Sequence, residues 1–221
     1  GAWDDRGAYT PNILAHKGKY YHAYTGLKGP FIKKYCQASI GLAVADSPDG
    51  PWKKLNNNPI IRPTDSFDAP DGFLCDDTVF VVKDQKIWLY YKGYAKGSDP
   101  KTGQAMRVRG TYLLLAVADK PEGPYAKHGK ILHRGHEAVV WKNPDGSVGS
   151  FCTGHGPAVY YESKDGVNFK AMNPIIRQKA IGVYRADFEE GNPGAKPAWG
   201  ISAMNNREGL GLRRIEIQWP E

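Results

Sequence analysis

The sequence lacks the features that would place the chain among membrane-spanning or disulfide-stabilised proteins. No apolar run approaches the roughly 20 residues that a membrane helix needs. Only three cysteines occur, Cys36, Cys75 and Cys152, without a C-x-x-C pair, which argues against a disulfide framework or a zinc knuckle and predicts small buried thiols. The 221 residues can form one sizeable core or two small domains.

A dense block of one charge is also missing. The formal net charge is +7, but the basic residues occur as isolated pairs such as Lys33-Lys34 and Arg213-Arg214. A scattered positive charge of this kind does not require an anionic partner. We therefore expect no nucleic-acid and no membrane partner, and an acidic or sulfated carbohydrate is an alternative reason for the charge.

Helical periodicity is almost absent, and the chain instead repeats a strand, a Pro/Asp/Gly turn and a second strand. The copies read "GLAVADSPDGPW", "LLAVADKPEGPY" and "VYYESKDGVNF", and their turn glycines are Gly50, Gly123 and Gly166. Such turns connect neighbouring antiparallel strands. Each copy thus predicts one hairpin.

A second hairpin precedes each copy. "TPNILAHKGKYYHAYTG" ends at Gly26, "DTVFVVKDQKIWLYYKG" at Gly93 and "EAVVWKNPDGSVGSFCTG" at Gly154. Repeated units of four strands predict an all-β fold, a β-propeller. A β-sandwich is the alternative, but a sandwich does not require the same sequence to recur in each pair of hairpins, so the repeats favour the propeller. We predict a single domain over residues 1–221 with four visible blades, roughly 8–65, 74–132, 134–176 and 180–219.

Alignment of the repeats places Thr10, Asp77 and Glu137 at one equivalent position near the start of an inner strand. Inner strands of a propeller line a central channel, so these positions are expected to approach one another. Two converging carboxylates suit glycoside hydrolysis, which needs an acid and a base or nucleophile. The plainer interpretation is that Asp76 and Asp77 accept backbone N–H groups at a strand start.

His136 and Glu137 are adjacent where a buried strand begins. Successive residues of a regular strand point to opposite faces, so both can reach one ligand only if the strand starts there or contains a bulge. Gly135 would allow such a distortion. The pair is therefore predicted to serve chemistry, although a lone histidine is more often structural.

Other residues are weaker candidates for substrate binding. They lie near strand starts or blade ends, or are aromatic and suited to stacking on a sugar, and packing within the blades is an equal alternative for each. The candidates are Thr10, Arg109, His155, Arg185, Trp3, Tyr9, Trp141 and Trp199.

These repeats resemble those of propeller glycoside hydrolases with five blades, the group that includes families 43 and 117. The "GHEAVVW" stretch is most similar to family 117, the 3,6-anhydro-L-galactosidases that act on neoagaro-oligosaccharides. The resemblance implies an exo-acting, inverting hydrolase of agar degradation in a polysaccharide-utilising bacterium, periplasmic or secreted, with a cytoplasmic location as the alternative. It makes His136 the acid, Glu137 and Asp77 the flanking carboxylates, and another aspartate the base.

The sequence departs from this pattern at the first blade. Thr10-Pro11 stands where the families place an aspartate, and four blades are visible where five are expected. We expect a blade that precedes Gly1 and carries the base to be absent; alternatively Asp4 or Asp5 supplies it, or the protein only binds sugar.

Family 43 is the second resemblance left open. It would make the protein an arabinofuranosidase or xylosidase, with His136 holding a cation or water in the channel. No cofactor is expected to be required, a divalent cation in the channel is an open alternative, and a homodimer is left open.

Overall fold

The computed structural model describes residues 2–29, 35–108, 110–153, 158–176, 181–206 and 209–219. They form an all-β protein whose sheets are the blades of a propeller, as predicted. The chain divides into two compact units, Gly1–Arg134 and Gly135–Glu221. In the described ranges, no helix has the length and apolar character needed to cross a membrane.

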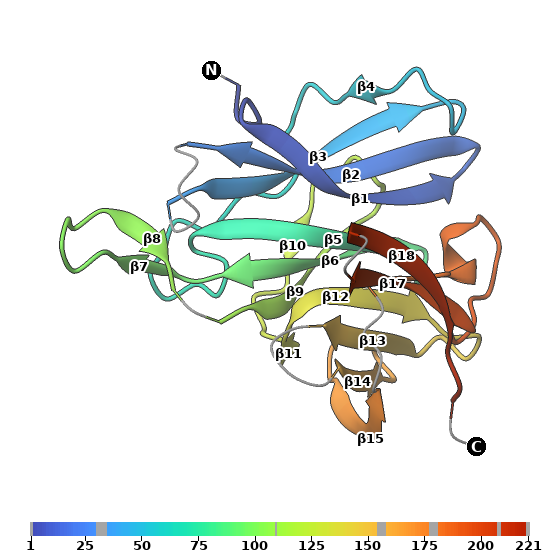
Figure 1. The fold of residues 1–221 in the computed structure, drawn as a ribbon. Helices are drawn as coiled ribbons and strands as arrows, with labels where there is room; N and C mark the ends of the chain where they lie inside the picture. Colours follow the sequence, from blue (N-terminus) through green and yellow to red (C-terminus); the bar gives the residue numbers. More distant parts are fainter. Residues whose placement is uncertain are drawn as a thin grey trace. The chain divides into compact units, whose positions relative to one another are not determined.

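The first blade is an antiparallel sheet of four strands in chain order (Figure 1). Its strands are β1 (Gly7–His16), β2 (Lys19–Lys28), β3 (Gln37–Ala45) and β4 (Lys53–Lys54). The two-residue turn between β1 and β2 has positive φ at both Lys17 (50°) and Gly18 (71°), which matches the twist of a tight hairpin. The Lys-Gly signal in the sequence thus gave the correct turn.

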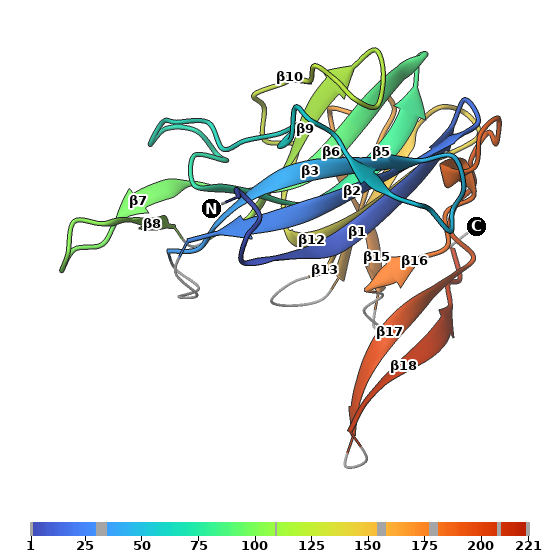
Figure 2. The same cartoon turned by 90° about the horizontal axis from the view of Figure 1, so that it is seen from above.

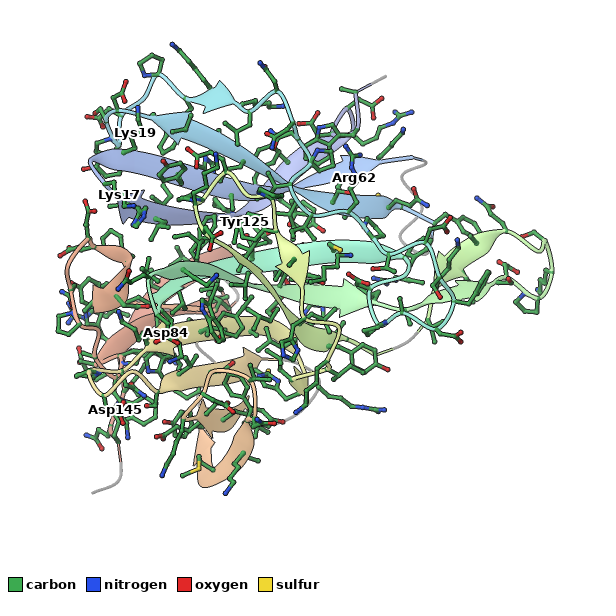
Figure 3. The ribbon with its side chains drawn as sticks, turned by 180° about the vertical axis from the view of Figure 1, so that it is seen from behind. Lys17, Lys19, Arg62, Asp84, Tyr125 and Asp145 are labelled. Atoms are coloured by element: carbon green, nitrogen blue, oxygen red, sulfur yellow. The ribbon has the colours of Figure 1, made fainter. Side chains whose placement is uncertain are left out.

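The second blade runs in the order β10-β9-β6-β5, and β11 also pairs with β9. Its strands are β5 (Leu74–Lys83), β6 (Lys86–Tyr94), β9 (Tyr112–Ala118), β10 (Ala126–Lys127) and β11 (His133–Arg134). Asp84 (52°) and Gln85 (57°) form its tight turn. Figure 3 labels Lys17 and Asp84, which lie on the same side of the view.

A small hairpin interrupts the second blade between β6 and β9. Its strands, β7 (Lys96–Ser98) and β8 (Ala105–Arg107), pair only with each other and extend away from the two sheets of the first unit (Figure 2). The repeats gave no sign of this hairpin, because it is an insertion present in one copy.

The two sheets of the first unit pack against each other, with β5 in contact with β1, β2 and β3. The core between them contains Leu14 and Leu42 from the first sheet and Phe80, Leu89 and Tyr91 from the second, each at most 2% exposed. Full burial of such a side chain contributes about 1.5–3 kcal/mol. This packing fixes the starts of β1 and β5 relative to each other.

The second unit contains the third and fourth blades. β12 (His136–Lys142), β13 (Val148–Thr153), β14 (Ala158–Ser163) and β15 (Lys170–Ile176) pair in chain order. β16 (Gly182–Val183), β17 (Trp199–Asn206) and β18 (Gly209–Glu216) form a sheet of three strands among the described residues. A short 3-10 turn, η1 (Ala186–Phe188), separates β16 from β17.

An aromatic cluster holds the second unit together. Trp141 is fully buried and stacks on Tyr160, with ring centroids 5.9 Å apart, and Phe151 stacks on Trp219 at 5.4 Å. Offset and tilted aromatic contacts of this kind add to the energy of burial.

The repeated turn glycines confirm the alignment of the blades. Gly50, Gly123 and Gly166 have φ of 91°, 85° and 79°, a conformation that favours glycine. The grouping of all four blades into one domain stays a prediction.

Candidate functional site

The three positions that the repeats align share an unusual backbone. Thr10, Asp77 and Glu137 have φ of 49°, 45° and 50°, and the strand register shifts at each of them. The left-handed conformation is costly for a residue with a side chain, about 1–3 kcal/mol. The inner strands of the first three blades therefore each contain a bulge, a feature that re-aims side chains and is frequent next to functional sites.

The bulge explains how His136 and Glu137, which are adjacent in the sequence, can both reach one ligand. β12 begins at His136, and its register shifts between His136 and Ala138. Regular alternation is thus interrupted at Glu137, as the adjacency predicted. Nδ1 of His136 lies 3.4 Å from Oε1 of Glu137, so the two side chains lie together rather than on opposite faces.

In the first unit, the bulges of the first two blades meet directly. Thr25 of β2 donates a hydrogen bond to Oδ1 of Asp76 at 2.9 Å and lies 2.7 Å from the Thr10 hydroxyl. The Thr10 hydroxyl also lies 3.5 Å from Oδ1 of Asp76, so both threonine hydroxyls are within reach of this carboxylate. Convergence of the inner-strand starts, predicted from the repeats, is confirmed for these two blades.

Asp76 is almost saturated with donors. Its Oδ1 also accepts the backbone N–H of Asp77 at 2.7 Å, and its Oδ2 lies 3.1 Å from Nζ of Lys92 in β6. Burial alone would raise the pKa of Asp76, but the Lys92 charge and the hydrogen bonds from Lys92 and Thr25 hold it below its ordinary value. The plainer interpretation, a backbone-capping aspartate, thus describes Asp76 well.

Asp77 has a different environment although it is the next residue. Its Oδ2 accepts a hydrogen bond from Lys92, and its side chain is 10% exposed. Burial and the neighbouring Asp76 carboxylate raise the pKa of Asp77 to about 7, although Lys92 acts in the opposite direction. Two adjacent carboxyls with opposed shifts form an arrangement that acid-base chemistry uses.

Lys92 is buried, with 4% of its surface exposed. Burial alone would lower the pKa of Lys92, but the two carboxylates raise it above its ordinary value. The ammonium group therefore stays charged and is shared by Asp76 and Asp77. Sequence reasoning missed both Lys92 and Thr25, although a signal was present: each stands directly before the glycine that ends its hairpin.

The remaining N-terminal candidates are engaged in local contacts. Oδ2 of Asp4 accepts hydrogen bonds from Tyr24 at 3.1 Å and Lys54 at 2.5 Å, and Asp5 is exposed. Trp3 stacks on Tyr24 with ring centroids 5.8 Å apart. None of these contacts identifies the general base, which stays a prediction.

Candidates of the second unit are also placed by packing. Arg185 is 8% exposed and binds Asp187 through Nε at 3.1 Å and a terminal nitrogen at 2.7 Å. The complete burial of Trp141 excludes stacking on a sugar, and Trp199 stacks on Tyr184. Arg109 and His155 lie outside the described residues.

Among the described residues, no three His, Cys, Asp or Glu side chains are grouped so that they could hold a metal ion. No disulfide joins the described cysteines; Cys75 and Cys152 are buried, and Cys36 is half-buried. A cation in the channel stays a prediction.

Comparison with known proteins places these features in a family. The model of glycosyl hydrolases family 43 matches residues 2–113, half of the chain, including both bulges of the first unit. The extracellular endo-alpha-(1->5)-L-arabinanase 2 of Bacillus subtilis (strain 168) is 31% identical over 124 residues, 49% of this chain and 25% of that protein.

Two solved structures are similar over nearly the whole chain. A family 117 glycoside hydrolase of the marine bacterium Zobellia galactanivorans is 28% identical with a TM-score of 0.75, over 92% of this chain and 57% of that one. An endo-arabinase from Bacteroides thetaiotaomicron VPI-5482 is 14% identical with a TM-score of 0.62, over 99% and 78%, and shows the fold alone. The chain thus spans a quarter of the arabinanase and somewhat more than half of the family 117 enzyme. From the match of the family model over half its length, the chain belongs to the glycosyl hydrolases of family 43.

Proposed function

We propose that the chain acts as an exo-glycoside hydrolase that releases a terminal 3,6-anhydro-L-galactose from neoagaro-oligosaccharides with inversion. The observation that carries the proposal is the recurrent bulge, which presents a carboxylate at the same position in the second and third blades, Asp77 and Glu137. The 28% identity to a family 117 hydrolase over 92% of the chain supports the choice of sugar.

The roles follow from acid-base hydrolysis. His136 donates a proton to the leaving oxygen as the bond from the anomeric carbon to that oxygen breaks. Water attacks the anomeric carbon from the opposite side and loses its proton to a carboxylate base. Glu137, 3.4 Å from the imidazole, orients the ring of His136, and Asp77 is the second flanking carboxylate.

An arabinan-directed hydrolase is the second candidate. It is favoured by the family 43 match and by the 31% identity to an endo-arabinanase over 124 residues. In that case His136 orders water or a cation, and the substrate is an arabinoside. The name of the same relative supports a secreted or periplasmic location under either proposal.

The experiment incubates the purified chain with neoagarobiose and, separately, with an aryl arabinofuranoside, and identifies the products by chromatography. Anhydrogalactose from the first substrate, lost in Glu137→Gln and in His136→Ala, is the expected result. Asp46→Asn, in an exposed ion pair with Lys19, is the matched control and should behave like the parent.

The other outcomes decide between the alternatives. Release of arabinose alone would overturn the first proposal in favour of the second. Binding of neoagarobiose without cleavage would instead identify a sugar-binding propeller, the interpretation that the threonine at position 10 favours.

A further inference from the structure

Lys92 occupies a position that the first and third blades give to threonine. The strand register pairs Tyr9 with Thr25, Asp76 with Lys92 and His136 with Thr153, each immediately before the bulged residue of its blade. The three partners are also equivalent in sequence, because each precedes the glycine that ends the hairpin. Among these three blades, the lysine occurs in the one whose bulge has two successive carboxylates.

The contacts show what the lysine supplies there. Nζ of Lys92 lies 3.1 Å from Oδ2 of Asp76 and also donates to Oδ2 of Asp77. Threonine could donate to one carboxylate, as Thr25 does to Asp76 at 2.9 Å, but its hydroxyl carries no charge. Two buried carboxylates in succession need a cation, since an unpaired buried charge is strongly unfavourable.

The two carboxylates use the lysine differently. Asp76 has further donors in Thr25 and the Asp77 backbone, so its orientation does not depend on Lys92 alone. The Asp77 carboxyl accepts a hydrogen bond from Lys92 and also interacts with the Asp76 carboxyl, so Lys92 is its cationic partner.

We infer that Lys92 is a positioning residue: its shared ammonium group aims the Asp77 carboxyl and supplies the positive charge that allows this carboxyl to ionise beside Asp76. The inference rests on the proposed function only in that the proposed function makes Asp77 a carboxylate of the hydrolytic site. It is distinct from the roles of acid and base, because Lys92 acts through Asp77.

Other charged and titratable groups lie around Asp77, and among those described Lys92 is the cation in direct contact with its carboxyl. Asp76 on β5 is an anion, and the phenols of Tyr9 on β1 and Tyr94 on β6 lie near the pair. Arg107 on β8 lies over the Tyr94 ring, 5.1 Å from its centroid. Partial burial and the neighbouring Asp76 carboxylate raise the pKa of Tyr9 well above its usual range, so its phenol is neutral near pH 7.

The test is a titration of the Asp77 carboxyl by carbon-detected NMR, with Asp77→Asn to assign the signal. In Lys92→Gln the midpoint should rise by at least about one pH unit, a tenfold change in the ratio of the two protonation states. In Lys92→Arg, which keeps the charge, it should stay within about half a unit. An unchanged midpoint in Lys92→Gln would overturn the inference.

A second measurement on the unchanged protein covers the case in which the glutamine variant does not fold. The Nζ signal of Lys92 should shift with the same midpoint as the Asp77 carboxyl, and a lysine signal that ignores this titration would equally overturn the inference. Neither readout needs a substrate. A chain that cleaves no sugar but shows both shifts would refute the proposed function and leave the role of Lys92 standing.

Discussion

The bulges of the first and second blades have the same backbone and opposite chemistry. Thr10 and Asp77 have nearly equal φ, 49° and 45°, yet the first blade pairs a threonine with a threonine and the second pairs two aspartates with a lysine. The bulged backbone is thus common to these two blades, and a few side chains determine whether the bulge carries charged groups. Three predictions address this difference, from the largest expected effect to the smallest.

Removal of the anchoring carboxylate should have the largest effect. Asp76→Asn leaves Lys92 with one anionic partner and places an amide against its ammonium group, so we expect the free energy of unfolding to fall by about 3–5 kcal/mol in urea titration at pH 7. In the first blade, Lys19→Met breaks the pair with Asp46, in which the two side chains are 50% and 86% exposed, and should cost far less because water solvates both charges. Equal losses of unfolding free energy in the two variants would show that the ion pairs of the charged bulge contribute no more to stability than an exposed ion pair.

The pH dependence of stability should distinguish the two blades next. The pKa of Asp77 is raised from 3.8 to about 7 on folding, so its contribution to stability is fully present below about pH 4 and is lost as the pH rises through 7. Asp77→Asn removes this loss. Relative to the parent, the variant should gain about 2–4 kcal/mol between pH 4 and pH 8 in urea titrations.

Comparison with the parent at each pH matters because Asp76 acts in the opposite sense. Its lowered pKa gives stability that is present at neutral pH and lost as the pH falls, and this contribution is common to both proteins if the Asp76 contacts persist. A constant difference between Asp77→Asn and the parent across this range would contradict the raised pKa.

The smallest effect should come from the hydroxyl that joins the two blades. Thr25→Val keeps the shape of the fully buried side chain and removes the donor to Asp76, at a cost of about 2 kcal/mol. The loss should be measurable by urea unfolding at pH 7. A variant as stable as the parent would mean that Lys92 and the Asp77 backbone already satisfy Asp76.

Much of this arrangement could be predicted from the sequence because the blades repeat. Turn residues such as Lys17-Gly18 and the glycines at 50 and 123 encode their backbone directly, and the alignment of Thr10, Asp77 and Glu137 is confirmed by their shared bulge. The bulge itself was predicted only where two functional residue types are adjacent. It was missed in the first two blades because nothing in their local sequence signals left-handed backbone.

The rest could not be predicted because it depends on partners across strands. The opposite pKa shifts of Asp76 and Asp77 depend on Thr25 and Lys92, which lie on two other strands. Likewise, Arg185 appeared suited to a substrate, and only the fold shows its guanidinium on Asp187. The sequence signal that could have revealed the charged bulge was Lys92, a lysine in a largely apolar strand directly before Gly93, the glycine that ends the hairpin.

The most direct test of the account is the catalytic efficiency of Asp77→Asn on whichever sugar the parent cleaves, measured beside Asp46→Asn. We predict that kcat/KM falls by about 100-fold or more in Asp77→Asn, the range expected for loss of an acid-base group, and that Asp46→Asn matches the parent. If Asp77→Asn folds and cleaves the sugar as well as the parent, the second-blade bulge is not part of the catalytic site.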